Sequence, residues 1–284
     1  MRPYYQDEAV TIWLGDCREI LPQIEAVDHV ITDPPYSEWV HAKVRRGGSV
    51  HAPDRTNGGP LRPVISSTTV LGFEAMTPQL RALCGAQFGR LARRWVLVFS
   101  DVESHGDWED VLVNDGGLEY VRCGAWVKLG ATPQFTGDRP ASGFEAVTIA
   151  HPKGRKRWNG GGAHALWTHP VVNGGSRCHT TQKPEALMTE LVAQFTDPGD
   201  LILDPFGGSG TTGVAAKRLG RRCILIEREE KYCAIAAQRL SQMALDVNWN
   251  SEINDKMGHA KMDARRDRKS TRLNSSHVSE FRMP

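Results

Sequence analysis

An acidic residue, two prolines and a tyrosine follow one another at the end of a short apolar run. The run is 30–32 (Val-Ile-Thr), and the turn consists of Asp33, Pro34, Pro35 and Tyr36. Each proline fixes its own φ angle, so the Pro34 carbonyl is held rigidly beside the Asp33 carboxylate. Two such acceptors can bind the hydrogens of a flat amine and free its lone pair, while Tyr36 offers a ring for stacking, worth about 1–3 kcal/mol. The turn therefore predicts binding of an amine on a planar ring, although alone it is equally consistent with an ordinary turn after a strand.

A glycine-rich turn lies far downstream, between a predicted strand at 201–203 and a predicted helix that continues through Leu219. Glycines let the backbone approach a ligand closely and expose N–H groups at the start of a helix. Glu227 ends the next predicted strand, where a carboxylate can accept hydrogen bonds from both hydroxyls of a ribose. No third glycine follows at dinucleotide spacing, so a bare adenosyl group fits better than a pyrophosphate. The predicted cofactor turn contains Asp204, Pro205, Phe206, Gly208, Ser209, Gly210, Thr211 and Thr212.

The two turns, in this order, resemble those of the amino methyltransferases of DNA. Such enzymes methylate the exocyclic nitrogen of adenine (N6) or cytosine (N4) with S-adenosylmethionine. The catalytic turn precedes the cofactor turn, as in the beta group of the family, whose sheet is a circular permutation of the usual methyltransferase sheet. The resemblance spans residues 10–243. It implies S-adenosylmethionine as cofactor, duplex DNA as partner, and flipping of the target base out of the helix.

The resemblance also assigns residues outside the two turns. The stretch 181–184 (Thr-Gln-Lys-Pro) matches a short motif ahead of the first family helix, so Thr181 and Lys183 are implied cofactor contacts. Asp16 lies in a Gly-Asp turn like the one that approaches the adenine of the cofactor, although such a residue is more often a helix cap. Glu145 lies in a stretch that resembles the region near the last family strand. A homodimer and a cognate restriction endonuclease are further partners that the resemblance implies.

The identity of the target base follows from the acid at position 33. The N4-cytosine enzymes more often have Ser-Pro-Pro-Tyr, so Asp33 favours the N6 amine of adenine. N4-cytosine methylation and an inactive DNA-binding relative are the alternatives. RNA and protein-amide methyltransferases usually place the cofactor turn first, which argues against them.

The net charge of +2 is spread unevenly, because no acidic residue occurs between Glu145 and Glu185. A run of charge is usually only a solvated surface, but tryptophans interrupt this basic stretch, which favours a polyanion surface. We therefore expect 151–180 to be a DNA target-recognition segment. The predicted phosphate contacts are Arg155, Lys156 and Arg157 there, and Lys43, Arg45 and Arg46 in a second basic stretch.

Predicted strands and helices alternate, which indicates an α/β fold with a mostly parallel sheet and helices on both faces. With the resemblance, the expected architecture is a circularly permuted Rossmann-like methyltransferase fold with a seven-stranded sheet. The catalytic domain is expected to span 1–250, with a long loop at 37–72. Residues 251–284 have no core pattern and are expected to be a disordered tail.

Composition limits the remaining possibilities. The 284 residues are 40% hydrophobic and 24% charged, as in an ordinary globular protein. No apolar run reaches the ~18 residues that span a bilayer, and the first residues contain no apolar signal region. The six cysteines form no Cys-x-x-Cys pair, so reduced thiols, no metal site and a cytoplasmic location are expected.

Overall fold

The computed structural model describes residues 2–36, 75–131, 133, 138, 140–172 and 182–243. Residues Met1–Leu240 form one compact unit. The long loop 37–72, including Lys43, Arg45 and Arg46, lies outside the described residues, as do Thr181 and the tail 251–284. Within the described part of the chain, no helix combines the length and apolar character needed to cross a membrane.

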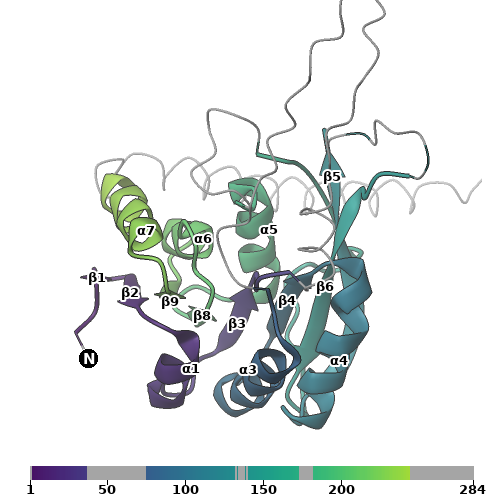
Figure 1. Cartoon of the computed structure of the whole chain (residues 1–284), viewed down its shortest axis with the longest axis horizontal. Helices are drawn as coiled ribbons and strands as arrows, with labels where there is room; N and C mark the ends of the chain where they lie inside the picture. The colour runs from purple at the N-terminus through teal and green to yellow at the C-terminus, as the bar shows by residue number, and fades with distance from the viewer. Residues whose placement is uncertain are drawn as a thin grey trace, which may run out of the picture. The chain divides into compact units, whose positions relative to one another are not determined.

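A single sheet of nine strands forms the centre of this unit (Figure 1). In spatial order its strands are β1 (Tyr5–Gln6), β2 (Val10–Leu14), β9 (Arg222–Glu227), β8 (Leu201–Asp204), β3 (His29–Thr32), β4 (Val96–Ser100), β6 (Phe144–His151), β5 (Glu119–Leu129) and β7 (Leu166–Pro170). The run from β2 to β4 is parallel, whereas β6 is antiparallel to both neighbours. The mostly parallel sheet is confirmed, but the expected count of seven is too low, because β1 and β7 extend the sheet at its two edges.

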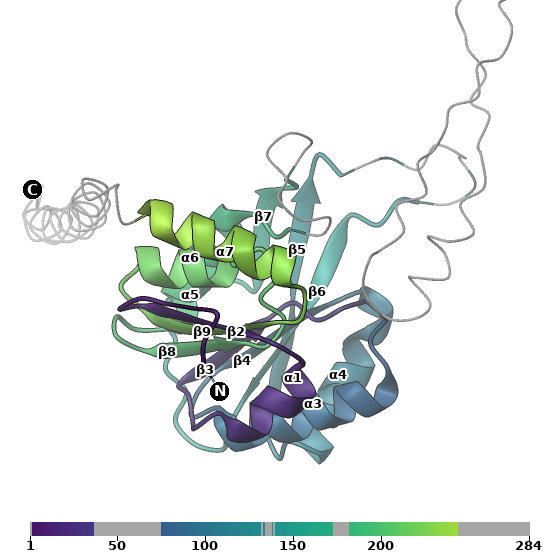
Figure 2. The same ribbon diagram turned by 60° about the vertical axis from the view of Figure 1, so that its left-hand side comes forward.

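Helices cover both faces of the sheet, as expected (Figure 2). One face is covered by α1 (Cys17–Ile20), α3 (Pro78–Leu91) and α4 (His105–Asn114), and the other by α5 (Glu185–Phe195), α6 (Thr211–Arg218) and α7 (Glu230–Met243). Val30, Val96 and Leu203 pack with the first set in a common hydrophobic cluster. Strands β3 and β4 are buried along their whole length, since a parallel sheet covered on both faces exposes neither side.

The order of the strands reverses between β8 and β3. From β8 the chain continues through α6 to β9 on one side, whereas from β3 it continues to β4 on the other. Val30 pairs with Leu203, so the first and last thirds of the chain meet in the middle of the sheet. A ligand crevice forms outside the carboxyl ends of strands at such a switch point.

The segment 151–180 contains an element that the sequence did not predict. Strand β7 pairs in parallel with β5, from Ala125↔Leu166 to Leu129↔Pro170. Trp167 is buried in it, and its indole Nε1 donates to Gln194 Oε1 at 2.9 Å. One buried aromatic residue among polar neighbours gives no alternation of apolar and polar residues, so the sequence pattern did not predict this strand.

Candidate active site

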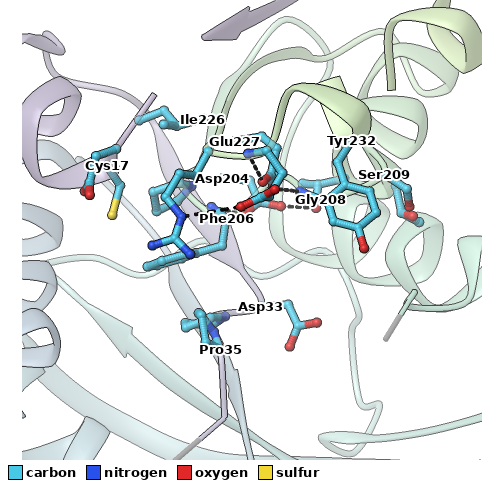
Figure 3. A pocket seen from close by; sticks show the side chains of 18 of the residues that line it. Cys17, Asp33, Pro35, Asp204, Phe206, Gly208, Ser209, Ile226, Glu227 and Tyr232 are labelled. Atoms are coloured by element: carbon cyan, nitrogen blue, oxygen red, sulfur yellow. Dashed lines mark hydrogen bonds and ion pairs between the residues drawn. The ribbon is translucent and has the colours of Figure 1, made fainter. Parts of the chain in front are cut away.

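A cavity of about 190 Å³ lies at the carboxyl ends of β3, β8 and β9. Both predicted turns line it. Asp33 and Pro35 point into it from the end of β3, opposite Gly208 and Glu227 from the ends of β8 and β9 (Figure 3). The structure thus brings together the two turns that the sequence separates by more than half the chain.

The glycines of the cofactor turn have backbone shapes that other residues rarely adopt. Gly208 has φ +49° and Gly210 has φ +78°, and α6 begins directly after Gly210. A Cβ atom on Gly210 would lie 2.7 Å from the Cβ of Ala236 in α7. The N–H of Gly207 donates to the carbonyl of Ile226 at 2.8 Å, which ties the turn to β9. The turn is therefore tight and open to the cavity at Gly208.

Glu227 is oriented by the backbone around it. Its Oε2 accepts from the N–H of Gly208 and its Oε1 from the N–H of Glu229, both at 2.8 Å. Burial raises the pKa of this carboxyl above its ordinary value, although these backbone donors oppose the shift. Each carboxylate oxygen can accept one further hydrogen bond, and Glu227 lines the cavity. The placement fits the predicted contact with ribose hydroxyls.

Asp204 serves the turn itself. Its carboxylate accepts from the hydroxyls of Thr32 at 2.7 Å and Thr212 at 2.6 Å, and from the N–H of Phe206 at 3.1 Å. The side chain is buried, and burial raises the pKa of its carboxyl despite these donors. Asp204 thus joins β3, β8 and α6. Both it and Thr212 line the cavity, but their polar atoms are already paired with each other.

Two further contacts fix the rim of the cofactor side. Arg239 of α7, which sequence reasoning missed, donates to the Ser209 carbonyl at 2.6 Å and to Thr211 Oγ1 at 3.2 Å. Asp16 caps α1 by accepting from the N–H of Arg18 at 2.8 Å, and it also lines the cavity. Hydrogen bonding from Arg18 lowers the pKa of Asp16. Asp16 therefore both caps the helix and lines the cavity.

An adenosyl group fits the side chains on this side of the cavity. Ile226 and Phe206 provide apolar surface next to the Glu227 carboxylate, as a flat base attached to a ribose requires. Five acidic residues and three basic ones line the cavity, and this excess of acids favours a cationic ligand over an anionic one; the acids are Asp16, Asp33, Asp204, Glu227 and Glu229, and the bases are Arg18, Lys183 and Arg228. A positively charged sulfonium therefore suits the site better than a phosphate.

The structure places Lys183 beside the catalytic turn, and its contact with the cofactor stays a prediction. Its ammonium donates to Oδ2 of Asp33 and forms an ion pair with Oε2 of Glu145 at 3.1 Å. The side chain is 4% exposed. Lys183 was expected to contact the cofactor, but its described partners are the catalytic turn and β6. The 181–184 motif therefore reaches the catalytic side of the cavity through Lys183.

Glu145 completes a buried polar cluster with this lysine. It accepts from the Tyr36 hydroxyl at 2.6 Å and pairs with Lys128 of β5 at 2.7 Å. Burial alone would raise the pKa of Glu145, but Lys183 and Lys128 outweigh burial and hold it below its ordinary value. Sequence comparison pointed to the stretch around Glu145 without a role for it. It gave no signal for Lys128, whose position in the middle of a strand looks ordinary.

Asp33 differs from Glu145 in the direction of its pKa shift. Burial raises the pKa of its carboxyl to about 6, with Lys183 opposing the shift and Glu145 adding to it. Its Oδ1 atom is buried and has no hydrogen-bond partner among the described residues. A buried acceptor without a partner is costly, and a ligand donor can satisfy it. Asp33 therefore presents one free acceptor at the cavity.

The three predicted phosphate contacts lie elsewhere. Lys156 pairs with Glu119 at the start of β5, and Arg157 pairs with Asp197 ahead of β8 at 3.0 Å. The carbonyl of Arg157 also accepts from Trp95 at the start of β4. These contacts put 155–157 at the amino ends of the parallel strands, the edge opposite the cavity. The phosphate contacts expected at Arg155, Lys156 and Arg157 therefore lie away from the cavity, and their contact with DNA stays a prediction.

Comparisons with known proteins agree with this site. A family model described as DNA methylase, of the N6/N4 type, matches residues 125–238. The chain is 26% identical over 279 residues to the type II methyltransferase M.HinfI of Haemophilus influenzae, covering 87% of this chain and 73% of that protein. It is 28% identical over 261 residues to the type II methyltransferase M2.LlaDCHI of Lactococcus lactis subsp. cremoris, covering 86% of this chain and 93% of the relative.

Solved structures show the same architecture. The crystal structure of the M1.HpyAVI–SAM complex superposes with a TM-score of 0.59 at 25% identity, over 81% of this chain and 98% of that one. The cytosine-N4-specific PvuII DNA methyltransferase superposes with a TM-score of 0.63 over 89% of this chain and 93% of its own, but at 17% identity, which shows the fold alone. The family model and the type II methyltransferase relatives support an amino DNA methyltransferase of the beta group, and together with the SAM complex they support S-adenosylmethionine as its cofactor.

Proposed function

We propose that this chain methylates the N6 amine of adenine in duplex DNA. The observation that supports it most is that Asp33 lines a cavity shared with Glu227 and that its Oδ1 atom has no hydrogen-bond partner among the described residues. An adenine amine has two hydrogens, and Oδ1 and the Pro34 carbonyl are two acceptors on one rigid turn. Accepting both hydrogens draws the nitrogen toward tetrahedral geometry and releases its lone pair for attack.

S-adenosylmethionine, when bound, would supply the methyl group from its sulfonium, and a neutral thioether would remain once the carbon is bonded to the amine nitrogen. The protein therefore needs no nucleophilic side chain; it aligns the two reactants and excludes water. The methylated nitrogen then carries a positive charge and loses one proton. Asp33, with a pKa of about 6, is ionised at neutral pH and suited to accept it.

Tyr36 provides the flat surface for the extruded base. Its hydroxyl is anchored on Glu145, which sets the orientation of the ring. Burial raises the pKa of the Tyr36 hydroxyl well above its ordinary value, so the ring stays neutral and the hydroxyl stays a donor. Extrusion of adenine costs a few kcal/mol of unstacking, about the size of the stacking that an aromatic ring returns.

DNA is proposed to approach the edge of the sheet where the cavity opens. Leu129, at the end of β5, and Phe144, at the start of β6, are 50% and 43% exposed on that edge. Strand β7 ends there too, since Pro170 pairs with Leu129. Residues 166–170 therefore reach this edge of the sheet, whereas 155–157 do not. A homodimer and a cognate restriction endonuclease belong to this proposal as implications of the resemblance, and a cytoplasmic location belongs to it as an expectation from the composition.

The choice between adenine and cytosine rests on the acid at position 33. Analysis of the product tests it directly. Unmethylated bacterial DNA is incubated with the protein and labelled cofactor, digested to nucleosides and separated by mass. Label in N6-methyladenine supports the proposal. Label in N4-methylcytosine alone overturns the choice of base and leaves the family and cofactor unaffected.

A further inference from the structure

The ammonium of Lys183 is a buried cation held between two carboxylates. It contacts Oδ2 of Asp33 on one side and Oε2 of Glu145 on the other. Its side chain is 4% exposed and that of Glu145 is 7% exposed. Taking an ammonium out of water costs several kcal/mol unless partners compensate, so its position is set by these two carboxylates.

Three aromatic rings surround the same ammonium. The nitrogen lies 5.0 Å from the ring centre of Phe99, 5.7 Å from that of Tyr36 and 5.8 Å from that of Trp126. Ring faces attract a cation within about 6 Å, and their bulk keeps water away. In such a low-dielectric setting, the ion pair with Asp33 is stronger than at a surface.

We propose that Lys183 is a positioning residue that holds Oδ2 of Asp33 and so reserves Oδ1 for the target amine, while Glu145 competes for the same ammonium and limits that hold. The inference rests on the proposed role of Asp33 as amine acceptor. It does not depend on which base is methylated. Neither Lys183 nor Glu145 needs to touch the substrate for this role.

The geometry predicts opposite effects of the two partners on the charge of Asp33. Lys183 favours the ionised carboxylate, because its positive charge lies in direct contact. Glu145 and Asp204 disfavour it, since both are carboxylates of the same buried region. Lys128 lies behind Glu145 and neutralises part of its charge. Removal of Lys183 should therefore raise the pKa of Asp33, and removal of the Glu145 charge should lower it.

The test measures methyl transfer in a single turnover, with saturating cofactor and unmethylated bacterial DNA, over roughly pH 5 to 9. The variants are Lys183→Met, Glu145→Gln and Lys183→Arg. Lys153→Met serves as the control, because Lys153 is an exposed lysine near the opposite edge of the sheet. Cofactor affinity is measured for each variant, so that damage to the cofactor side is detected separately.

The rate should rise with pH as Asp33 ionises. Lys183→Met should move that rise upward by about one pH unit or more, and Glu145→Gln should move it downward. The pH profile of Lys183→Arg should lie close to that of the wild type, because arginine keeps the positive charge. The profile of Lys153→Met should match the wild type. A purely structural role would lower the rate by the same factor at every pH.

Unshifted pH profiles in both variants would overturn the inference. If Lys183→Met has no measurable activity, Glu145→Gln decides alone: a downward shift supports the role and an unchanged profile contradicts it. Failure of the proposed function looks different. Methylation of cytosine leaves the shifts in place, whereas full activity of Asp33→Asn removes Asp33 from the reaction altogether.

Discussion

Lys183 and Asp33 form a direct ion pair although 150 residues separate them in the chain. The contact joins the short motif ahead of α5 to the turn after β3. It means that the two halves of the site are not independent, since a residue expected on the cofactor side sets the geometry of the catalytic acid. The pair also explains how a carboxylate can remain ionised in a buried position, because an ammonium of opposite charge is buried with it.

The first prediction concerns Asp33 itself. Asp33→Ala should abolish methyl transfer while cofactor affinity stays within a few-fold of the wild type, because Glu227 and the turn 204–210 hold the cofactor. Transfer is followed with tritiated cofactor, and affinity by calorimetry on the same preparations. Activity within about tenfold of the wild type, a loss of only ~1.4 kcal/mol, would exclude the amine-acceptor role.

Glu227 should determine cofactor affinity rather than chemistry. The two carboxylate oxygens of Glu227 accept from the backbone N–H groups of Gly208 and Glu229. In Glu227→Gln one of these oxygens becomes an N–H₂ group, so one backbone donor loses its acceptor. Affinity should fall about tenfold or more, since hydrogen bonds to a charged group are worth about 1.5–3 kcal/mol. Glu230→Gln is the matched control, because Glu230 is exposed on α7. An equal effect of both substitutions would remove the special role of Glu227.

The parts of the site that the sequence predicted are local ones. The turn 33–36 and the turn 204–210 each follow a buried strand, and their residue types specify their shapes whatever lies around them. Glu227 was found because it ends the next strand, at a spacing that a βαβ unit dictates. Adjacent strands of one parallel sheet then bring such strand ends to one edge.

The parts that it missed depend on contacts between distant segments. Nothing near Lys183 says that its partners are Asp33 and Glu145, and nothing near Arg239 says that it holds Ser209. The basic run 155–157 shows that a surface is charged but not at which edge of the sheet it lies. Strand β7 was missed because an edge strand with one buried side resembles a polar loop.

The turn at Gly210 should tolerate no side chain. Gly210→Ala combines a positive φ with a Cβ 2.7 Å from Ala236, whereas Gly220→Ala has a similar φ of +71° and no atom within 4 Å. Both variants carry the strain of a positive φ. The difference between their free energies of unfolding therefore measures the overpacking at Gly210, which typically costs about 1–3 kcal/mol. Urea denaturation of the two variants measures it. Equal free energies of unfolding would show that α7 moves aside.

The basic run 155–157 should contribute little to DNA binding. Changing Arg155, Lys156 and Arg157 together to alanine should leave the salt dependence of DNA affinity unchanged, because the run lies at the edge opposite the cavity. Each phosphate contact, if present, would add about 0.9 to the slope of log affinity against log salt. A slope reduced by ~2 or more would show that DNA reaches this edge as well.

The last prediction links the catalytic acid to stability. Burial raises the pKa of Asp33 from 3.8 to about 6 in the folded state. The protonated carboxyl thus favours folding, and this contribution is present below pH 3.8 and lost as the pH rises through about 6. Asp33→Asn cannot titrate, so its free energy of unfolding should rise relative to that of the wild type between roughly pH 4 and pH 6, and the difference should level off above that range.

Urea denaturation without cofactor at several pH values measures this gap. Asp115→Asn, at an exposed position after α4, is the control, and its gap to the wild type should stay flat. A gap that widens with pH only for Asp33→Asn would show that the enzyme gives up stability at neutral pH to keep a buried carboxylate ready for the amine. A constant gap for Asp33→Asn would mean that Lys183 compensates the charge fully, and the carboxyl would then titrate near its ordinary value.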